Sequence, residues 1–260
     1  MATDADPPAI LTRAALPVSR TAAYGPDPAQ VYDVRSPTRA PGGTTVVVIH
    51  GGFWRAEFDR SHAASQAQAF ADNGFHVAVL EYRRVGMTGG GWPGTFQDVA
   101  AAVAAVRADP ELPDRVVLVG HSAGGHLAAL VASQPAALGL RGVVCLAGCV
   151  DLALTARMGL GAGAAQTLMG GEPEDLPDAY AEADPCALTP AVPVVLLHGA
   201  DDQVVPPAVS RSYWDRMQRS TRAHAEVRHT VIPACEHFGL IDPGHPAFAD
   251  VLDSVRSLAP

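Results

Sequence analysis

The sequence predicts an α/β protein whose mostly parallel central sheet is covered by helices on both faces. Strand-like and helix-like segments alternate along the chain with short connections, the order typical of parallel strands joined by crossover helices. Several strand-like segments are continuous aliphatic runs, as expected for strands that are buried on both faces. The length of 260 residues and the hydrophobic content of 48% allow one large domain with a substantial core.

Strands are expected where apolar runs end at turn residues. The segment 31–37, "VYDVRSP", predicts an early edge strand that ends at Pro37, because proline has no N–H to donate to a neighbouring strand. The segment 44–50, "TTVVVIH", is largely β-branched and predicts a strand buried on both faces. Further strands are expected at 75–82, 115–120, 141–148, 192–199 and 225–233.

Helices are expected between these strands. The segment 61–74 offers Ser61 as an N-cap and Gly74 as a stop, because glycine readily adopts the left-handed conformation of a helix end. The segment 95–109 is rich in alanine, the residue with the highest helix propensity. Further helices are expected at 123–134, 207–218 and 246–258.

Two segments depart from the alternation of strands and helices. Residues 1–23 are expected to form a flexible N-terminal arm. Residues 151–191 contain no predicted strand and are rich in glycine, alanine and methionine. A long insertion of this kind is either a functional lid or disordered. We therefore predict a single α/β domain over 24–260, with a small lid over about 151–191.

The charge of the chain limits its partners. A formal net charge of −9 argues against nucleic acid and anionic membranes, since both recruit basic patches. No segment approaches the roughly 20 apolar residues of a membrane span. The N-terminus also lacks the basic start and apolar stretch of a secretory signal. We expect a cytoplasmic protein that acts on a small molecule, either as a monomer or as a homodimer.

The cysteines and histidines show no metal-binding spacing. Cys145, Cys149, Cys186 and Cys235 form no CxxC pair, so we expect buried free thiols. No pair of histidines has the spacing of a zinc site such as H-E-x-x-H. The sequence therefore predicts no metal site.

The stretch 120–124, "GHSAG", matches the G-x-S-x-G pattern between a predicted strand and a predicted helix. In that context, small residues allow a sharp turn that presents the hydroxyl of Ser122 as a nucleophile. The alternative is a glycine-rich turn with a capping serine. A hydroxyl is a weak nucleophile, so catalysis also requires a general base and a group that orients it.

An acid and a histidine follow in the required order. The strand 192–199 is followed by Asp201 and Asp202, and the D-x-x-V-P spacing favours Asp202. Asp201 is then expected to be a turn residue. Among the ten histidines, His237 completes the order Ser…Asp…His in a loop after the last predicted strand. Histidine suits a general base because its pKa lies near neutral pH.

The stretch 50–54, "HGGFW", follows the first buried strand and predicts an oxyanion hole. Negative charge on a carbonyl oxygen needs preorganised N–H donors, and glycines let the backbone approach closely. The expected donors are the N–H of Gly52, with Gly51 or Phe53, and the N–H of Ala123. His50 is expected to anchor this loop. A tight turn without a catalytic role is the alternative.

Together, the segments "HGGFW", "GHSAGGHLA", "ADDQVVP" and "CEHFGLIDP" resemble the α/β-hydrolase fold, from about residue 24 to the C-terminus. They are most similar to the branch that holds bacterial carboxylesterases and kynurenine formamidase. The resemblance implies a Ser122–His237–Asp202 triad, no cofactor, and hydrolysis of an ester or amide. Esterases of the hormone-sensitive-lipase type usually carry a third glycine in the oxyanion loop, where this chain has Phe53.

The substrate is the least determined property. An apolar, adaptable pocket is expected from five side chains, with core packing as the alternative for the first two: Phe53, Trp54, Met158, Met169 and Phe238. A small ester or an N-formyl aryl amide fits such a pocket. A thioesterase or acyltransferase with the same triad remains open, as does a non-catalytic binding protein. A dinucleotide-binding enzyme is disfavoured because the first buried strand is not followed by G-x-G-x-x-G.

Overall fold

The computed structural model of the chain describes residues 9–13, 15–222 and 225–259. Within them, an eight-stranded sheet has the order β1-β2-β4-β3-β5-β6-β7-β8. The β1–β2 and β2–β4 pairs are antiparallel and all other neighbouring strands are parallel. The predicted mostly parallel sheet is therefore confirmed. The strands are β1 Arg20–Ala23, β2 Val31–Arg35, β3 Thr45–Ile49, β4 His76–Leu80, β5 Val116–His121, β6 Leu140–Leu146, β7 Val194–Gly199 and β8 Val227–Ile232.

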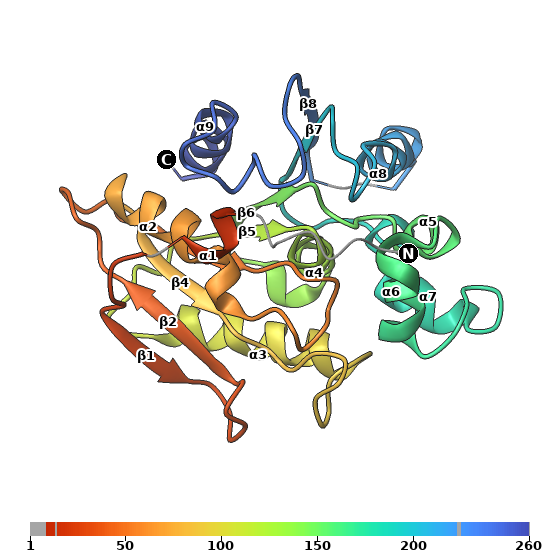
Figure 1. Cartoon of the computed structure of the whole chain (residues 1–260), viewed down its shortest axis with the longest axis horizontal. Helices are drawn as coiled ribbons and strands as arrows, with labels where there is room; N and C mark the ends of the chain where they lie inside the picture. The colour runs from red at the N-terminus through yellow and green to blue at the C-terminus, as the bar shows by residue number, and fades with distance from the viewer. Residues whose placement is uncertain (1–8, 14, 223–224, 260) are drawn as a thin grey trace.

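Helices cover both faces of this sheet (Figure 1). The α-helices are α1 Ala9–Thr12, α2 Ala64–Asp72, α3 Gly94–Ala108, α4 Ala123–Ala132, α5 Leu152–Arg157, α6 Leu160–Met169, α7 Pro177–Ala183, α8 Ala208–Arg219 and α9 Phe248–Leu258. Three short 3-10 helices, η1 Arg60–Ala63, η2 Pro135–Ala137 and η3 Pro185–Ala187, complete the described elements. Each helix predicted from the sequence has a counterpart, with ends shifted by a few residues.

Alternate strand residues belong to two separate cores. In β3, Val47 and Ile49 pack on the side of α3, α4 and α8, whereas Val46 and Val48 pack on the side of α2 and α9. Successive side chains of a strand point to opposite faces, so a strand between two helical layers must be apolar at every position. All five residues of β3 are buried, as the continuous apolar run predicted.

The N-terminal region differs from the expectation of a loose arm. Residues 20–23 form β1, which pairs with β2 from Arg20↔Val34 to Ala23↔Val31. Strand β2 therefore lies inside the sheet, and the prediction that it is the edge strand is wrong. Half-buried and exposed positions alternate along the four residues of β1, so its sequence contains no apolar run. Residues 1–8 of the expected arm lie outside the described residues.

The start of the 61–74 helix also differs from the prediction. The carboxylate of Asp59, not the side chain of Ser61, caps this region by accepting the Ser61 N–H at 2.9 Å. The chain then makes one 3-10 turn, η1, before α2 begins. Gly74 follows the helix with a φ of +89°, as expected of a helix stop.

The predicted lid segment is helical and contains no strand among its described residues. It forms α5, α6, α7 and η3 between β6 and β7. These α-helices gather at one side of the molecule, on the right in Figure 1.

Candidate active site

Ser122 lies at a sharp turn between β5 and α4. Its φ of 55° and ψ of −118° are unfavourable for a residue with a side chain, so the surrounding fold must hold this conformation. Two glycines make the turn possible. A Cβ at Gly120 would overlap the carbonyl oxygen of Gly124, and a Cβ at Gly124 would overlap that of Ile49. The spacing of small residues in "GHSAG" is therefore required by close backbone contacts.

Asp202 and His237 come from separate loops and meet directly. The Nδ1 of His237 donates to Oδ2 of Asp202 over 2.7 Å, and both residues are buried. Asp202 follows β7 and His237 follows β8, so the parallel strands bring them to the same edge of the sheet. This hydrogen bond leaves Nε2 as the unprotonated nitrogen of a neutral His237. Asp201, the alternative acid, is exposed.

Asp202 accepts several further hydrogen bonds. Its Oδ1 accepts the N–H groups of Val204 and Val205, each at 2.8 Å. The Nε2 of His198 lies 3.3 Å from Oδ2. Burial alone would raise the pKa of Asp202, but the hydrogen bonds from His198 and His237 dominate and lower it below its ordinary value. The carboxylate is therefore charged and fixed in orientation.

Two histidines that were assigned no role from the sequence, His62 and His121, form a hydrogen-bonded chain that ends at the backbone of His237. His121 also precedes Ser122 in the sequence. The Nε2 of His121, next to Ser122, donates to the carbonyl oxygen of His237 over 3.0 Å. The rings of His121 and His237 are 4.5 Å apart. Because Nε2 of His121 carries the hydrogen, its Nδ1 accepts from Nε2 of His62, 3.2 Å away. Burial lowers the pKa of His62 to about 3 and that of His121 well below its usual value, so both are neutral.

The loop 50–54 lies against the serine turn. A Cβ at Gly51 would be 3.1 Å from the Cβ of Ser122. Gly52, Phe53 and Trp54 have φ angles of +110°, +50° and +57°, so the loop makes an unusual left-handed turn. Its shape is held in part by the N–H of Arg55, which donates to the Gly52 carbonyl at 3.0 Å.

Several backbone donors in the loop 50–54 and the serine turn have no partner among the described residues. Within the described part of the chain, the N–H groups of Gly52, Phe53 and Ala123 donate to no protein acceptor. Ala123 is the first residue of α4, so its N–H has no partner in the helix and lies at the positive end of the helix dipole. These donors are the groups that an oxyanion would need.

His50 anchors this loop, as the sequence suggested. Its Nδ1 donates to the carbonyl oxygen of Gly51 at 2.8 Å, and its ring stacks on Tyr82 with centroids 4.5 Å apart. Its Nε2 lies 3.2 Å from a carboxylate oxygen of Glu81. Burial lowers the pKa of His50 to about 3. His50 is thus neutral and embedded, and its contacts are structural.

The helical insertion packs on the loop 50–54. The guanidinium of Arg55 donates to the carbonyl oxygen of Gly161 in α6. A Cβ at Gly161 would lie 2.5 Å from Cδ1 of Phe53, so the two are in close contact. The N–H of Trp92 donates to the Leu168 carbonyl at 2.8 Å. In this conformation Ser122 is only 2% exposed.

The five side chains expected to line a pocket have different environments. Phe53 and Phe238 are half-buried, and the ring of Phe238 lies 5.0 Å from that of His237. Trp54 is fully buried with its ring edge-on to His126, so the core-packing alternative holds for it. Met169 is also part of the core, because α6 turns it inward, whereas Met158 is 42% exposed.

The described residues contain no cluster of three or more histidine, cysteine or acidic side chains that could hold a metal ion. All four cysteines are free; Cys145, Cys149 and Cys235 are buried, and Cys186 is half-buried. Burial raises the pKa of Cys145 to about 12, so this thiol is unreactive. None of the described helices is long and apolar enough to cross a membrane.

Comparison with protein families gives one match. The family model described as BD-FAE matches residues 32–217, which include the serine turn, the loop 50–54 and Asp202. His237 lies beyond the matched region. Among curated proteins, a probable isoprenylcysteine alpha-carbonyl methylesterase of Oryza sativa subsp. japonica is 27% identical over 232 residues. That alignment covers 78% of this chain and 53% of the relative, so the chain spans about half the length of the curated relative.

Solved structures share the fold at low identity. A truncated carbohydrate esterase from gut microbiota has a TM-score of 0.78 at 22% identity, covering 93% of this chain and 97% of that one. Esterase B of Lactobacillus rhamnosis has a TM-score of 0.74 at 23% identity, covering 92% and 84%. Esterase Est2 of Thermogutta terrifontis has a TM-score of 0.71 at 20% identity, covering 93% and 91%.

Proposed function

The chain belongs to the BD-FAE family and has the α/β-hydrolase fold, and from this premise we propose that it is a serine carboxylesterase. Ser122 is the nucleophile, His237 the general base and Asp202 the group that orients the base. The N–H groups of Gly52 and Ala123, with Gly51 or Phe53, form the oxyanion hole. The descriptions of the similar proteins as esterases and a methylesterase support this class of reaction.

The proposed reaction proceeds in two steps through an acyl-enzyme. His237 takes the proton of Ser122 at Nε2 while the serine oxygen attacks the ester carbonyl. The oxyanion hole binds the negative charge of the tetrahedral intermediate, and one such donor is typically worth about 2.7–4 kcal/mol. The protonated His237 gives its proton to the leaving alcohol. Water then repeats the sequence and releases the acid.

The observation that carries the proposal is the Asp202–His237 hydrogen bond of 2.7 Å beside a strained serine turn. His121 precedes Ser122 and donates to the carbonyl oxygen of His237, so the serine turn and the loop of the proposed base are hydrogen-bonded to each other. A capping serine would need neither the left-handed φ nor a nearby histidine oriented by a carboxylate. The arrangement therefore supports nucleophilic catalysis over the glycine-rich turn and over a binding protein.

Small substrates are favoured within this class. The α6 helix contacts the oxyanion loop, and Ser122 has little solvent exposure under this arrangement. Phe53, in the loop 50–54, and Phe238, whose ring lies 5.0 Å from that of His237, are half-buried aromatic side chains. A short acyl ester fits this setting. The aromatic side chains also favour an N-formyl aryl amide as a second candidate.

The test is turnover of Ser122→Ala on a panel of p-nitrophenyl esters of increasing chain length, with N-formylkynurenine. We expect kcat to fall by about 10⁴-fold or more without loss of folding, because no other group supplies the nucleophile. Ser133→Ala, at the other end of α4, is the matched control and keeps full activity. Esterase activity retained in Ser122→Ala contradicts the assignment.

The same panel separates the candidates. Flat activity on short esters supports a general carboxylesterase, and strong preference for the formyl amide supports an arylformamidase. Product analysis by mass spectrometry, with and without added thiols or alcohols, detects acyl transfer to another acceptor.

A further inference from the structure

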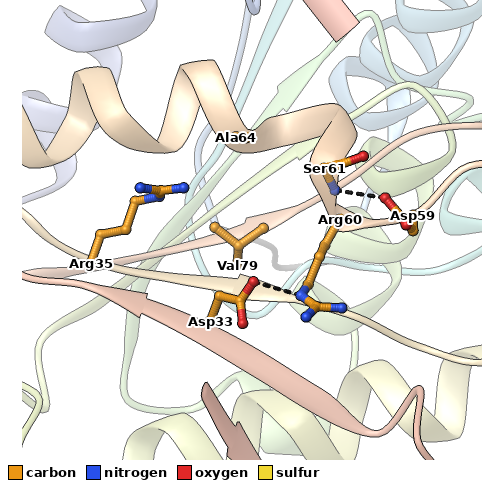
Figure 2. Close-up of a pocket in the computed structure, with 7 residues that line it drawn as sticks. All are labelled: Asp33, Arg35, Asp59, Arg60, Ser61, Ala64 and Val79. Carbon is orange, nitrogen blue, oxygen red and sulfur yellow. Dashed lines mark hydrogen bonds and ion pairs between the residues drawn. The ribbon is translucent and has the colours of Figure 1, made fainter. Parts of the chain in front are cut away.

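A cavity of about 280 Å³ lies between β2, β4 and the start of α2, apart from the proposed catalytic groups. Its lining residues include Asp33 and Arg35 from β2, Val79 from β4, and Arg60 and Ala64 at the start of the helical segment. None of them belongs to the proposed catalytic groups. In Figure 2 the Arg35 side chain extends beneath α2 on one side of Val79, and Arg60 with Asp33 occupies the other side.

Arg35 has an unusual set of partners for a buried cation. Its side chain is at the cavity, and the residue is only 7% exposed. Nη1 donates to the carbonyl oxygen of Leu16 and, at 3.1 Å, to the side-chain amide oxygen of Gln68. Both acceptors are neutral. Nε is buried and has no hydrogen-bond partner, and Arg35 forms no ion pair with any residue that the structure describes.

The acidic residues around the cavity are already engaged. Asp33 accepts from Nε of Arg60 at 2.6 Å and from the hydroxyl of Thr21 at 2.6 Å. Asp59 caps the helical segment through the Ser61 N–H. Burial, partly offset by the charge of Asp33, lowers the pKa of Arg35. A buried charge is costly unless an opposite charge and hydrogen bonds accompany it, and no carboxylate among the described residues bonds to this guanidinium.

We propose that this cavity binds a small monocarboxylate, whose oxygens accept hydrogen bonds from the Nη2 side of the Arg35 guanidinium and whose short apolar part contacts Val79 and Ala64. The planar fork of a guanidinium matches the two oxygens of a carboxylate. The cavity lining holds two arginines and two aspartates, Asp33 and Asp59, so its formal charge is zero. A lining without net charge tolerates the single charge of a monoanion better than the two charges of a dianion such as hydrogen phosphate.

The experiment is calorimetric titration of the full chain with sodium butyrate at constant ionic strength, with sodium chloride and inorganic phosphate as the other probes. We expect saturable butyrate binding, no saturable response to chloride, and at least about tenfold weaker binding of phosphate. Arg35→Gln is expected to weaken butyrate binding about tenfold or more. Arg39→Gln removes the same charge from an exposed position four residues further along and leaves binding unchanged.

Butyrate can also enter the proposed catalytic site, and the Arg35 variant separates the two locations. Equal butyrate binding by wild type and Arg35→Gln overturns the proposal, as does no binding by wild type up to about 100 mM. Phosphate binding as tight as butyrate binding overturns the choice of a monocarboxylate.

A second measurement decides the matter if Arg35→Gln does not fold. The Nε–H resonance of Arg35 in ¹H–¹⁵N spectra of the wild type shifts with butyrate and not with chloride if the carboxylate binds there. An unshifted Arg35 resonance at saturating butyrate contradicts the proposal. Both readouts report binding alone, so failure of the proposed esterase activity leaves them unaffected.

Discussion

At the scale of single residues, Asp202 shows how the fold orients His237, the proposed catalytic base. Two backbone N–H groups hold one of its oxygens, while His237 and His198 approach the other. With every direction of approach occupied, the carboxylate cannot rotate away from His237. No described residue donates in this way to the exposed side chain of Asp201, which favours Asp202 as the proposed orienting acid.

We therefore predict that Asp202→Asn lowers kcat by about 10³- to 10⁴-fold, because an amide no longer holds the imidazole in the required tautomer. The pKa of Asp202 is lowered in the folded state, so its charge stabilises the fold above about pH 4 and this contribution is lost as the pH falls further. Denaturant titrations between about pH 5 and 3 should show a smaller loss of stability for Asp202→Asn than for wild type.

Asp201→Asn is the control for both measurements and should resemble wild type. Wild-type turnover by Asp202→Asn would exclude Asp202 as the orienting acid.

His121 carries a second prediction at this scale. Its Nε2 holds the backbone of His237, and His62 fixes its tautomer. Loss of that hydrogen bond in His121→Phe lets His237 shift relative to Ser122, and small displacements of a base are costly. We expect kcat to fall about 10- to 100-fold with KM nearly unchanged. Equal kcat in variant and wild type would show that the His237 loop holds its position without His121.

At the scale of elements, the contact between the serine turn and β3 determines the site. Gly124, the second residue of α4, lies against the carbonyl oxygen of Ile49, the last residue of β3, and loop 50–54 continues from there toward Ser122. The proposed nucleophile and oxyanion donors are thus positioned by a single close approach of helix to strand. Only glycine, which has no Cβ, fits at position 124 against the carbonyl oxygen of Ile49.

Gly124→Ala is expected to destabilise the protein by about 2–3 kcal/mol, because the new methyl group must push the helix from the strand. Gly43→Ala, where a Cβ meets nothing within 4 Å, is the matched control with little effect. Thermal or denaturant unfolding measures the difference. Equal stability of the two variants would mean that the helix moves without cost.

At the scale of the whole molecule, the insertion between β6 and β7 reaches back to a loop about a hundred residues earlier. Phe53 contacts Gly161, and Arg55 binds the Gly161 carbonyl. Gly161 and Gly159 both have left-handed φ angles, of 58° and 61°, but a Cβ at Gly159 meets nothing within 4 Å. The two glycines therefore share a left-handed conformation, which glycine adopts without strain, and differ in their contact with the loop 50–54.

This difference predicts separate outcomes for two alanine substitutions. Gly161→Ala and Gly159→Ala should each lose about 1 kcal/mol of stability to the left-handed conformation. Only Gly161→Ala displaces Phe53, so only it should change kcat or KM on short esters, by about tenfold. Steady-state kinetics of both variants tests this, and equal kinetics would show that the insertion does not act on the loop.

The amino-acid sequence by itself determined the layered α/β fold, because continuous apolar runs between helical segments can be buried only in a parallel sheet with two helical layers. It also determined the serine turn and the candidate residues, since local backbone sterics and chain order suffice to locate them. Only the tertiary structure decided that β1 covers β2, that Trp54 is core, and that His62 supports His121. Trp54 and His62 depend on contacts between distant segments, which no local pattern records, and the short β1 has no apolar run that would have predicted it. The environment of Arg35 is a further example, because only the arrangement of its described neighbours shows that the acceptors of its guanidinium are neutral groups.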